Sequence, residues 1–554
     1  MPLLDLQQQT VDMVKDAMKE YKFIFVDAPP GSGKSLINLY SAKGKKAYVT
    51  TPQRLLVKQY LNSIENVPVY DGLGVGVMGK ATYRCNFLTE KEGVYQNCDG
   101  APCSEKVNGE MTYCKYYKSG CEYRDAVRIA QNSPVTITTL PYALMAIMRG
   151  IQNHAMLTRE EAEAEAEDPE NLKGWFMRDI LIIDEAHSFD DAITGFFTVD
   201  LTPYSFDQQI EFDVLLEKIR EKSNELENIV NQHVSKEVKD VVVKNASKEL
   251  RTIIINHVSE IIEKTKTKLE VESSDVIKKT LRTRIERMEH LVLKLNYDVD
   301  YVIQTSDVAI SIKPYSPAPF IKSFLYAFEN VIFSSATFVN LDLLTKSLGI
   351  EPQDWVEISV PSTFDPNKAP IVFDSVGKIN RDTLESTLPK IVKVIDEYSN
   401  LYNDQRVLVH CHTYQIQNYI AQNMPEPNRT RLITHSSKDR ESQEKEFEIS
   451  ANGIFLSVNM TEGLDLKDDL CRLQIIVKCP YLNLGDKWIK EHYDRDGKVW
   501  YDTKTLSTVI QACGRIIRNN EDWGVTVILD PNIFYLIERY KSKTPESFMQ
   551  RIRK

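Results

Sequence analysis

The chain has 554 residues, of which 42% are apolar, 27% charged and 9% aromatic, and its formal net charge is −11. This length predicts roughly three or four domains with cores of their own. No apolar run is long enough to span a membrane, and the acidic early residues predict no secretory leader. We therefore expect an intracellular protein (cytoplasm and nucleoid, or nucleus) with reduced thiols. On so acidic a chain, any nucleic-acid site must be a local basic groove.

Short apolar runs alternate with helical stretches along most of the chain. In the first half, the runs that read as buried strands are 22–28, 45–51, 134–140 and 178–187, and 56–64 reads as a helix. From about residue 346 the pattern resumes, with runs at 406–412, 453–458, 473–478 and 525–530. Such alternation predicts parallel sheets covered by helices, and therefore two α/β domains.

Two dissimilar segments interrupt the first of these domains. Residues 76–130 are rich in Cys, Tyr and Lys and show no clear periodicity. Residues 205–305 place apolar side chains at helical spacing, as at Leu215, Ile219, Leu226 and Ile229, and again from Ile277 to Leu295 after a potential "SSD" N-cap (273–275). This predicts an antiparallel, all-helical insertion. The acidic stretch 158–174 reads as a solvated loop.

The stretch "FIFVDAPPGSGKS" (23–35) reads as a strand, a glycine turn and the start of a helix. Such a turn directs backbone N–H groups at phosphate oxygens, with Lys34 reaching the β- and γ-phosphates and Ser35 the magnesium ion. The strict pattern has glycine where this chain has Ala28. The predicted phosphate-binding residues are Ala28, Pro29, Pro30, Gly31, Ser32, Gly33, Lys34 and Ser35.

A second strand, "LIIDEAH" (181–187), ends in two carboxylates and a histidine. Beside a phosphate loop, Asp184 can hold magnesium and Glu185 can activate the attacking water. His187 would then couple this site to the neighbouring domain. A strand that ends in Asp-Glu is unremarkable by itself. The prediction of a catalytic role rests on its combination with the phosphate loop.

Near the end of the chain, "QACGRIIRNNEDWG" (511–524) places Arg515 and Arg518 three residues apart, on one face of a predicted helix. A solvated basic helix is the simplest interpretation of such a pair. The alternative is an arginine finger on the γ-phosphate, which contributes about 10³–10⁵ in rate and would come from the second α/β domain.

The ordered set of motifs resembles the superfamily-two helicases, and more closely their XPD/DinG-like branch. The motifs are Gln7, "APPGSGKS", "TTPQRLLVKQY", "DEAH", "FSSAT" (333–337), "VNMTEGLDL" (458–466), "VKCPYLNLGD" (477–486) and "QACGRIIR". The resemblance implies two RecA-like P-loop NTPase domains, with an iron–sulfur insert and a helical arch insert in the first. It also implies roles for Gln7, Gly463 and Asp465 in nucleotide binding and for Gln511 in catalysis.

The cysteines are concentrated in one place, since five of the nine lie between Cys85 and Cys121. The resemblance places a 4Fe–4S domain here, which needs four thiolates. It implies Cys85, Cys103, Cys114 and Cys121 as ligands, with Cys98 as the alternative to Cys103. Zinc is the rival metal, although the segment lacks the paired C-x₂-C knuckles that favour zinc. Cys411, Cys471, Cys479 and Cys513 read as core residues.

Basic and aromatic side chains alternate around these cysteines and suit phosphate contacts with base stacking. Tyrosines that simply pack within the segment are the alternative. The residues are Lys80, Tyr83, Arg84, Tyr113, Lys115, Tyr116, Tyr117 and Lys118.

The expected order of segments follows from these observations. Helicase domain 1 takes 1–75, 131–204 and 306–345, the iron–sulfur domain 76–130, the helical arch 205–305, and helicase domain 2 346–554. The implied function is an ATP- and Mg²⁺-dependent DNA helicase that moves 5′ to 3′. Its implied partners are single-stranded DNA, duplex junctions and loading or repair proteins, and we expect a monomer.

Three other functions are compatible with parts of this pattern. A nucleic-acid-stimulated ATPase could remodel complexes without separating strands. A non-catalytic binding module is opposed by the intact set of Lys34, Asp184, Glu185 and Arg515. A phosphotransferase is opposed by the second-domain motifs "EGLDL" and "QACGRIIR".

Overall fold

A computed structural model describes most of the chain. The described residues are 3–29, 31–65, 74–99, 101, 103–107, 110–146, 178–206, 209–231, 236–297, 299–458, 471–516 and 522–553. They divide into two compact units. The first comprises 1–25, 35–334 and 344–356, and the second comprises 26–34, 335–343 and 357–554. The acidic stretch 158–174 lies outside the described residues.

A seven-stranded sheet in the order β12-β1-β11-β7-β2-β6-β3 forms the framework of the first α/β region. Its strands are β1 (Phe23–Asp27), β2 (Ala47–Thr51), β3 (Gly74–Val77), β6 (Val135–Thr139), β7 (Ile180–Asp184), β11 (Asn330–Ser335) and β12 (Trp355–Ser359). The pairs β2–β6, β2–β7, β3–β6 and β7–β11 are parallel. All five residues of β2 and of β7 are buried, as expected for strands covered on both faces.

Two strands of this sheet fall outside the predicted boundaries. β12 belongs to the first sheet, although the sequence analysis began the second domain at residue 346, because only pairing with β1 decides which sheet a short strand joins. β3, with the sequence "GVGV", overlaps the start of the predicted cysteine domain. Helix α3 (Arg54–Glu65) packs so closely on β3 that a Cβ on Gly74 would lie 2.3 Å from the Ile64 side chain.

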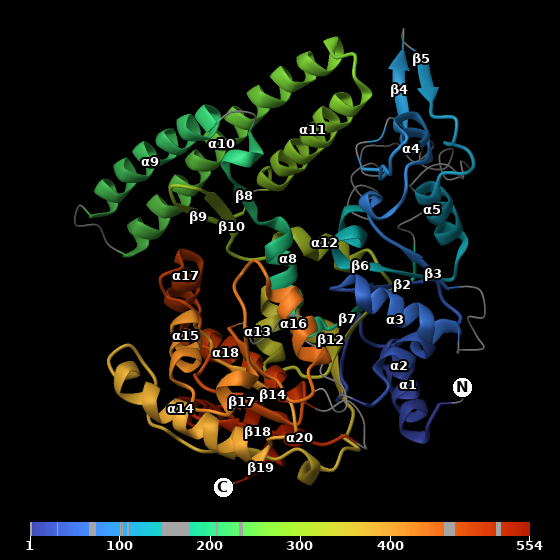
Figure 1. Ribbon diagram of the computed structural model, residues 1–554. Coiled ribbons are helices and arrows are strands. Elements are labelled where there is room, and N and C mark those ends of the chain that lie inside the picture. Colours follow the sequence, from blue (N-terminus) through green and yellow to red (C-terminus); the bar gives the residue numbers. More distant parts are fainter. Residues whose placement is uncertain are drawn as a thin grey trace. The chain divides into compact units, whose positions relative to one another are not determined.

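The helical insertion consists of three helices, α9 (Gln209–Asn231), α10 (Lys236–Val271) and α11 (Asp275–Leu295), and α10 packs against both of the others (Figure 1). Leu215 and Ile219 are buried as predicted, whereas Ile277 is 47% exposed. Ser274 is the N-cap residue of α11, but its side chain makes no capping bond. The Glu272 carboxylate instead accepts the backbone N–H groups of Ser273 and Ser274, each at 2.8 Å.

A small antiparallel sheet, unforeseen from the sequence, flanks the insertion. It has the order β8-β10-β9, with β8 (Val199–Leu201), β9 (Tyr301–Thr305) and β10 (Ile310–Pro314). Because β8 precedes the insertion and β9 follows it, pairing through β10 brings the two ends of the insertion together.

The cysteine segment contains α4 (Asn86–Glu92), the hairpin β4 (Ser104–Val107) and β5 (Glu110–Tyr113), and α5 (Glu122–Asn132). Polar contacts join it to α11. Lys91 pairs with Asp275, and the Lys279 ammonium donates to the side-chain oxygens of Gln96 at 3.0 Å and Asn97 at 3.3 Å. The helical insertion therefore supports the cysteine segment directly.

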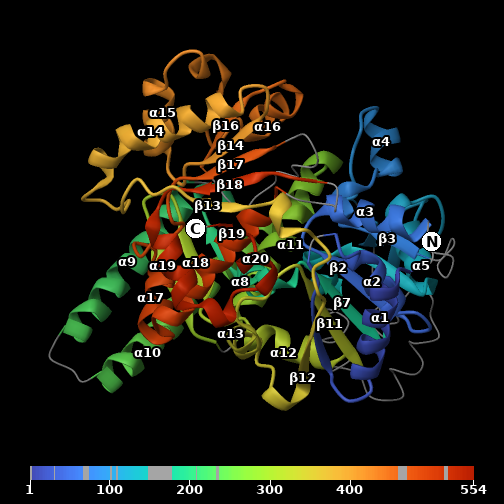
Figure 2. The same cartoon turned by 90° about the horizontal axis from the view of Figure 1, so that it is seen from below.

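The second unit is built on a sheet in the order β15-β16-β14-β17-β18-β13-β19. Its strands are β13 (Ile371–Phe373), β14 (Val407–His410), β15 (Leu432–Thr434), β16 (Ile454–Ser457), β17 (Leu473–Ile476), β18 (Val525–Ile528) and β19 (Ile552–Arg553). Helices α14 (Leu384–Leu401) and α15 (Tyr414–Asn423) cover one face, and α18 (Gly497–Gly514) and α19 (Pro531–Arg539) the other (Figure 2).

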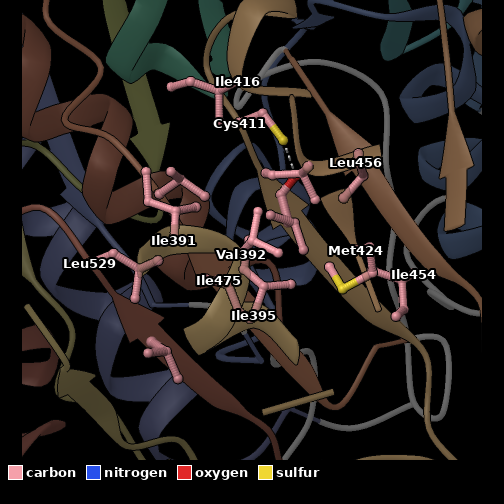
Figure 3. Close-up of a cluster of buried hydrophobic side chains, with 14 of the residues drawn as sticks. Ile391, Val392, Ile395, Cys411, Ile416, Met424, Ile454, Leu456, Ile475 and Leu529 are labelled. Carbon is pink, nitrogen blue, oxygen red and sulfur yellow. Dashed lines mark hydrogen bonds between the residues drawn. The ribbon is translucent and has the colours of Figure 1, made fainter. Parts of the chain in front are cut away.

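Alternate strand residues of this sheet enter two separate cores. Ile475 packs in one core with Ile391 and Ile416 (Figure 3), and Val527 belongs to the same core. Their neighbours Ile476 and Ile528 enter the core of α18 and α19. Cys411 lies in the first of these cores, and Cys471, Cys479 and Cys513 are also fully buried, as predicted for core cysteines. Within the described ranges, no helix is both long and apolar enough to cross a membrane.

Candidate nucleotide site and cysteine pocket

The predicted phosphate loop lies between β1 and α2 (Lys34–Ser41). Gly31 and Gly33 have φ angles of 81° and 82°, in the left-handed region that glycine adopts without steric cost. The Ala28 N–H donates to the Ser335 carbonyl at 2.8 Å, which ties the loop to the "SSAT" segment after β11. Pro30 lies outside the described residues. Two left-handed glycines directly before a helix start suit a turn whose backbone N–H groups face phosphate.

The "DEAH" residues follow β7 in the same sheet. Asp184 is buried at the end of the strand, and Glu185 has a φ of 53°, which is costly for a residue with a side chain. His187 Nδ1 lies 3.4 Å from Glu185 Oε2. The predicted role of His187 toward the other domain stays a prediction, and its observed neighbour is the glutamate of its own turn.

Tyr60, on α3, links the two motifs and was missed by the sequence analysis. Its buried hydroxyl accepts a hydrogen bond from the Asn38 amide at 2.9 Å. Burial raises the pKa of Tyr60 well above its ordinary value, Asp184 raises it further, and Asn38 and Ser35 oppose the rise. The two predicted magnesium ligands, Ser35 and Asp184, therefore meet at one hydroxyl. Nothing in the local sequence distinguishes this tyrosine from a core residue.

Asp27, the last residue of β1, is a second site residue that the sequence analysis did not single out. Burial raises its pKa from 3.8 to about 7, and the Glu357 carboxylate adds to the rise while Lys34 opposes it. Its carbonyl accepts the Val360 N–H at 2.8 Å. A carboxyl group that titrates near neutrality thus directly precedes the phosphate loop.

Replacement of Asp27 by Asn should change the pH dependence of stability. The folded chain holds the Asp27 proton up to about pH 7, whereas the unfolded chain releases it near 3.8, so wild-type stability falls as pH rises through this window. We expect Asp27→Asn to gain stability over wild type between pH 4 and pH 7.5, by up to about 4 kcal/mol, and the gain to level off above that. Urea denaturation across this range measures it, and a gain independent of pH would contradict the raised pKa.

Glu185→Gln should bind ATP and DNA normally and hydrolyse ATP very slowly, because the amide cannot accept a proton from water while Asp184 still holds magnesium. Single-turnover hydrolysis and equilibrium nucleotide binding check this. An exposed carboxylate such as Glu92 provides the matched control, since Glu92→Gln should keep full turnover. If ATP affinity falls as steeply as turnover, Glu185 is a metal ligand instead.

Of the other residues predicted to bind nucleotide or to act in catalysis, the structure describes some and leaves others out. Gln7 is buried, and its amide oxygen accepts the Leu4 N–H at 3.1 Å, so this oxygen caps helix α1 (Asp5–Ala17). Gln511 lies in α18, where its amide donates to Ser507 at 3.2 Å. Gly463, Asp465 and Arg518 lie outside the described residues.

Helix α18 ends at Gly514 and Arg515 is its C-cap residue, so Arg515 does not lie within a helix as predicted. Glycine is a poor helix former, which explains the stop. Arg515 lies near His410, at the end of β14. Burial and the charge of Arg515 together lower the pKa of His410 to about 3, so this imidazole is neutral.

All five cysteines of the segment line one small pocket, together with Asn86, Phe87, Ala101 and Tyr116. Backbone pairing brings the first two together, since the Cys85 N–H donates to the Gln96 carbonyl at 2.7 Å and the Cys98 N–H to the Tyr83 carbonyl at 3.0 Å. The Cys114 N–H donates to the Cys103 carbonyl at 3.0 Å. These thiols are spread over 37 positions of the sequence, and the fold brings them into one pocket.

Cys85 and Cys121 are the N-cap residues of α4 and α5. The Cys98 thiol bonds to both, which is the largest cause lowering the pKa of each to about 6, and N–H groups in the first turn of each helix add to the effect. The same contacts raise the pKa of Cys98. Two thiolates at helix N-termini, with a third sulfur between them, are typical of a soft-metal site.

Among the described residues, no group of three or more His, Cys, Asp or Glu side chains is arranged to hold a single metal ion. A 4Fe–4S cluster needs four thiolates, and the five cysteines that line this pocket are enough to supply them. The segment's own buried core consists of Cys85, Leu88 and Cys98. Such a small core needs an additional link, and a cluster would provide it.

The comparisons with known proteins point in one direction. Residues 395–551 match the family described as the helicase C-terminal domain. The ATP-dependent DNA helicase YoaA of Escherichia coli K12 is 25% identical over 263 residues, which are 45% of this chain and 40% of YoaA. A Fanconi anemia group J protein homolog of Gallus gallus is 30% identical over 82 residues, 13% of this chain and 6% of that protein. The chain thus spans less than half the length of these relatives.

Two solved structures share the whole fold. The structure named XPD_Helicase has a TM-score of 0.60 at 15% identity and covers 98% of both chains. Xpd4 of S. tokodaii has a TM-score of 0.58 at 14% identity and covers 99% of both. The chain is therefore similar to the XPD/DinG-like branch of the superfamily-two helicases. The predicted fold class, with two RecA-like α/β domains, is confirmed.

Proposed function

We propose that this XPD/DinG-like chain is an ATP-dependent DNA helicase that moves 5′ to 3′ along single-stranded DNA and unwinds duplexes in repair, replication or recombination. The observation that carries the proposal is the left-handed turn at Gly31 and Gly33 directly before α2, which begins at Lys34. Ser35 and Asp184, which both act on the pKa of the buried Tyr60 hydroxyl, support it. The helicase C-terminal match in the second unit supports the same function.

Each site residue has a role in the proposed hydrolysis. Lys34 neutralises charge on the β- and γ-phosphates, Ser35 and Asp184 hold Mg²⁺, and Glu185 orients the attacking water. Arg515 and Arg518 stabilise the charge that develops on the transferred phosphoryl group. Separating one base-pair step costs about 1.4 kcal/mol, a modest load for a nucleotide-driven step.

We further propose that the cysteine pocket holds a 4Fe–4S cluster. When bound, the cluster supplies iron–thiolate bonds that link the parts of the segment to one another, and it takes no part in electron transfer. The ligand set implied by the resemblance was Cys85, Cys103, Cys114 and Cys121. The bonds of the Cys98 thiol to Cys85 and Cys121 favour a set of Cys85, Cys98 and Cys121, completed by Cys103 or Cys114.

Unwinding of 5′-tailed and 3′-tailed duplexes with ATP and Mg²⁺ tests the function, with Lys34→Ala as the inactive control. We expect unwinding of the 5′-tailed duplex only. Unwinding of only the 3′-tailed duplex would refute the polarity. Hydrolysis stimulated by single-stranded DNA without unwinding of either duplex would refute helicase action in favour of a translocase.

A further inference from the structure

The four tyrosines of the cysteine segment that were predicted to contact nucleic acid are not equivalent. Two of them are used within the segment's own packing. The Tyr83 hydroxyl accepts the Met78 N–H at 3.1 Å, and its ring centroid lies 5.5 Å from that of Tyr123. Tyr116 donates to the Glu90 carboxylate, which also pairs with Lys115 at 2.6 Å. These two rings are therefore structural.

The other two tyrosines form a column with an arginine. The ring centroids of Tyr113 and Tyr117 are 4.5 Å apart, and the Arg124 guanidinium carbon lies 3.4 Å from the Tyr117 centroid. Cation–π and ring contacts of this kind hold the members in place. Tyr113, at the end of the column, is 53% exposed. The tyrosine column (Tyr113, Tyr117 and Arg124) thus presents a supported aromatic ring to solvent.

The column is anchored to the cysteine pocket at two points. The Tyr117 N–H donates to the Cys114 carbonyl at 2.8 Å, and Arg124 lies in the first turn of α5, whose N-cap is Cys121. Any group that fixes these cysteines also fixes the column. A rigid aromatic platform loses little conformational entropy when a ligand stacks on it.

The charge around the column favours an anionic chain. Of the nearby carboxylates, Glu90 is paired with Lys115, and Asp125 is paired with Arg128. Lys118 is exposed and forms no ion pair with any residue that the structure describes. An exposed aromatic ring at the end of the column and an exposed lysine next to Tyr117 in the sequence suit a nucleotide, with its base on the ring and its phosphate on the lysine.

We propose that the tyrosine column is a stacking platform for an unpaired base of single-stranded DNA, a use that rests on the proposed DNA helicase function. The base stacks on Tyr113, Tyr117 and Arg124 support that ring from below, and Lys118 contacts the adjoining phosphate. Since every base has a π face, such a platform accepts any sequence.

Equilibrium binding of the full-length chain to fluorescent oligo(dT) tests the platform. We expect Tyr113→Ala to bind about tenfold more weakly, within the range measured when a stacked base loses its ring, and Tyr113→Phe to bind within about twofold of wild type. Tyr95 is the matched control, because it lies in the same segment, is 64% exposed and has no ring partner among the described residues. Tyr95→Ala should bind like wild type.

An abasic oligonucleotide of the same length isolates stacking from other effects. On this ligand the difference between wild type and Tyr113→Ala should vanish, because no base remains to stack. A difference that persists on the abasic strand, or Tyr113→Ala affinity equal to wild type on oligo(dT), would overturn the platform while leaving the helicase proposal in place. Absence of oligo(dT) binding by the wild-type chain would overturn both.

Discussion

Lys34→Ala should hydrolyse ATP at no measurable rate and should still bind single-stranded DNA. The Lys34 ammonium, at the first position of α2, is the only side-chain cation within the loop 28–35. Without it, charge on the β- and γ-phosphates stays uncompensated in the transition state, and no other side chain of the loop can replace it. Steady-state phosphate release with saturating oligo(dT) measures the loss.

A control separates loss of chemistry from loss of fold. Lys43 follows α2 and is exposed, so Lys43→Ala should keep wild-type turnover. Lys34→Ala should also melt cooperatively and bind oligo(dT) as tightly as wild type. Wild-type turnover in Lys34→Ala would refute the assignment of residues 28–35 as the phosphate loop.

Serine replacement of Cys85, Cys98 or Cys121 should each remove the cluster. The wild-type chain purified without oxygen should be brown, with about four irons and four sulfides and negligible zinc. Serine is a poor iron ligand, and these three cysteines line the same pocket. Iron and sulfide analysis, absorbance and limited proteolysis of the segment measure the loss independently of activity.

The fourth ligand can be identified in the same series. Of Cys103→Ser and Cys114→Ser, one should retain the cluster and the other lose it. Cys411→Ser should keep the colour, because Cys411 lies in the core of the second unit. Retention of the cluster in Cys98→Ser would show that Cys98 is not a ligand, in agreement with the set Cys85, Cys103, Cys114 and Cys121 that the resemblance implies.

Cluster loss should affect the two activities unequally. DNA-stimulated ATP hydrolysis should persist in part, because Lys34 and Glu185 lie outside the segment. Unwinding should fail, since the segment would no longer be a rigid body held through Lys279 and Asp275 to α11. A colourless, zinc-loaded chain that still unwinds DNA would refute the cluster proposal.

Much of the fold was predictable because its signals are local. The buried parallel strand β7 is a continuous apolar run up to Asp184, and α9 and α10 bury apolar residues at helical spacing. The glycine turn at Gly31 and Gly33 follows from the conformations that only glycine adopts readily. For these elements, a few consecutive residues are enough to determine the secondary structure.

Other features depend on partners that are distant in sequence. β12 joins the first sheet because it pairs with β1, more than 300 residues earlier, and the raised pKa of Asp27 arises from burial and from Glu357 on that same strand. Tyr60 meets Ser35 and Asp184 only through packing of α3.

The sequence by itself determined that this chain carries a phosphate loop, a "DEAH" strand and a cysteine-rich insert, because each is a contiguous motif. Only the tertiary structure decided that all five thiols share one pocket, that Cys98 bonds to both Cys85 and Cys121, and that Tyr113 is held outward by Tyr117 and Arg124. The reason is physical: contacts between side chains on separate turns, helices and hairpins are set by how those elements pack, which no local pattern encodes.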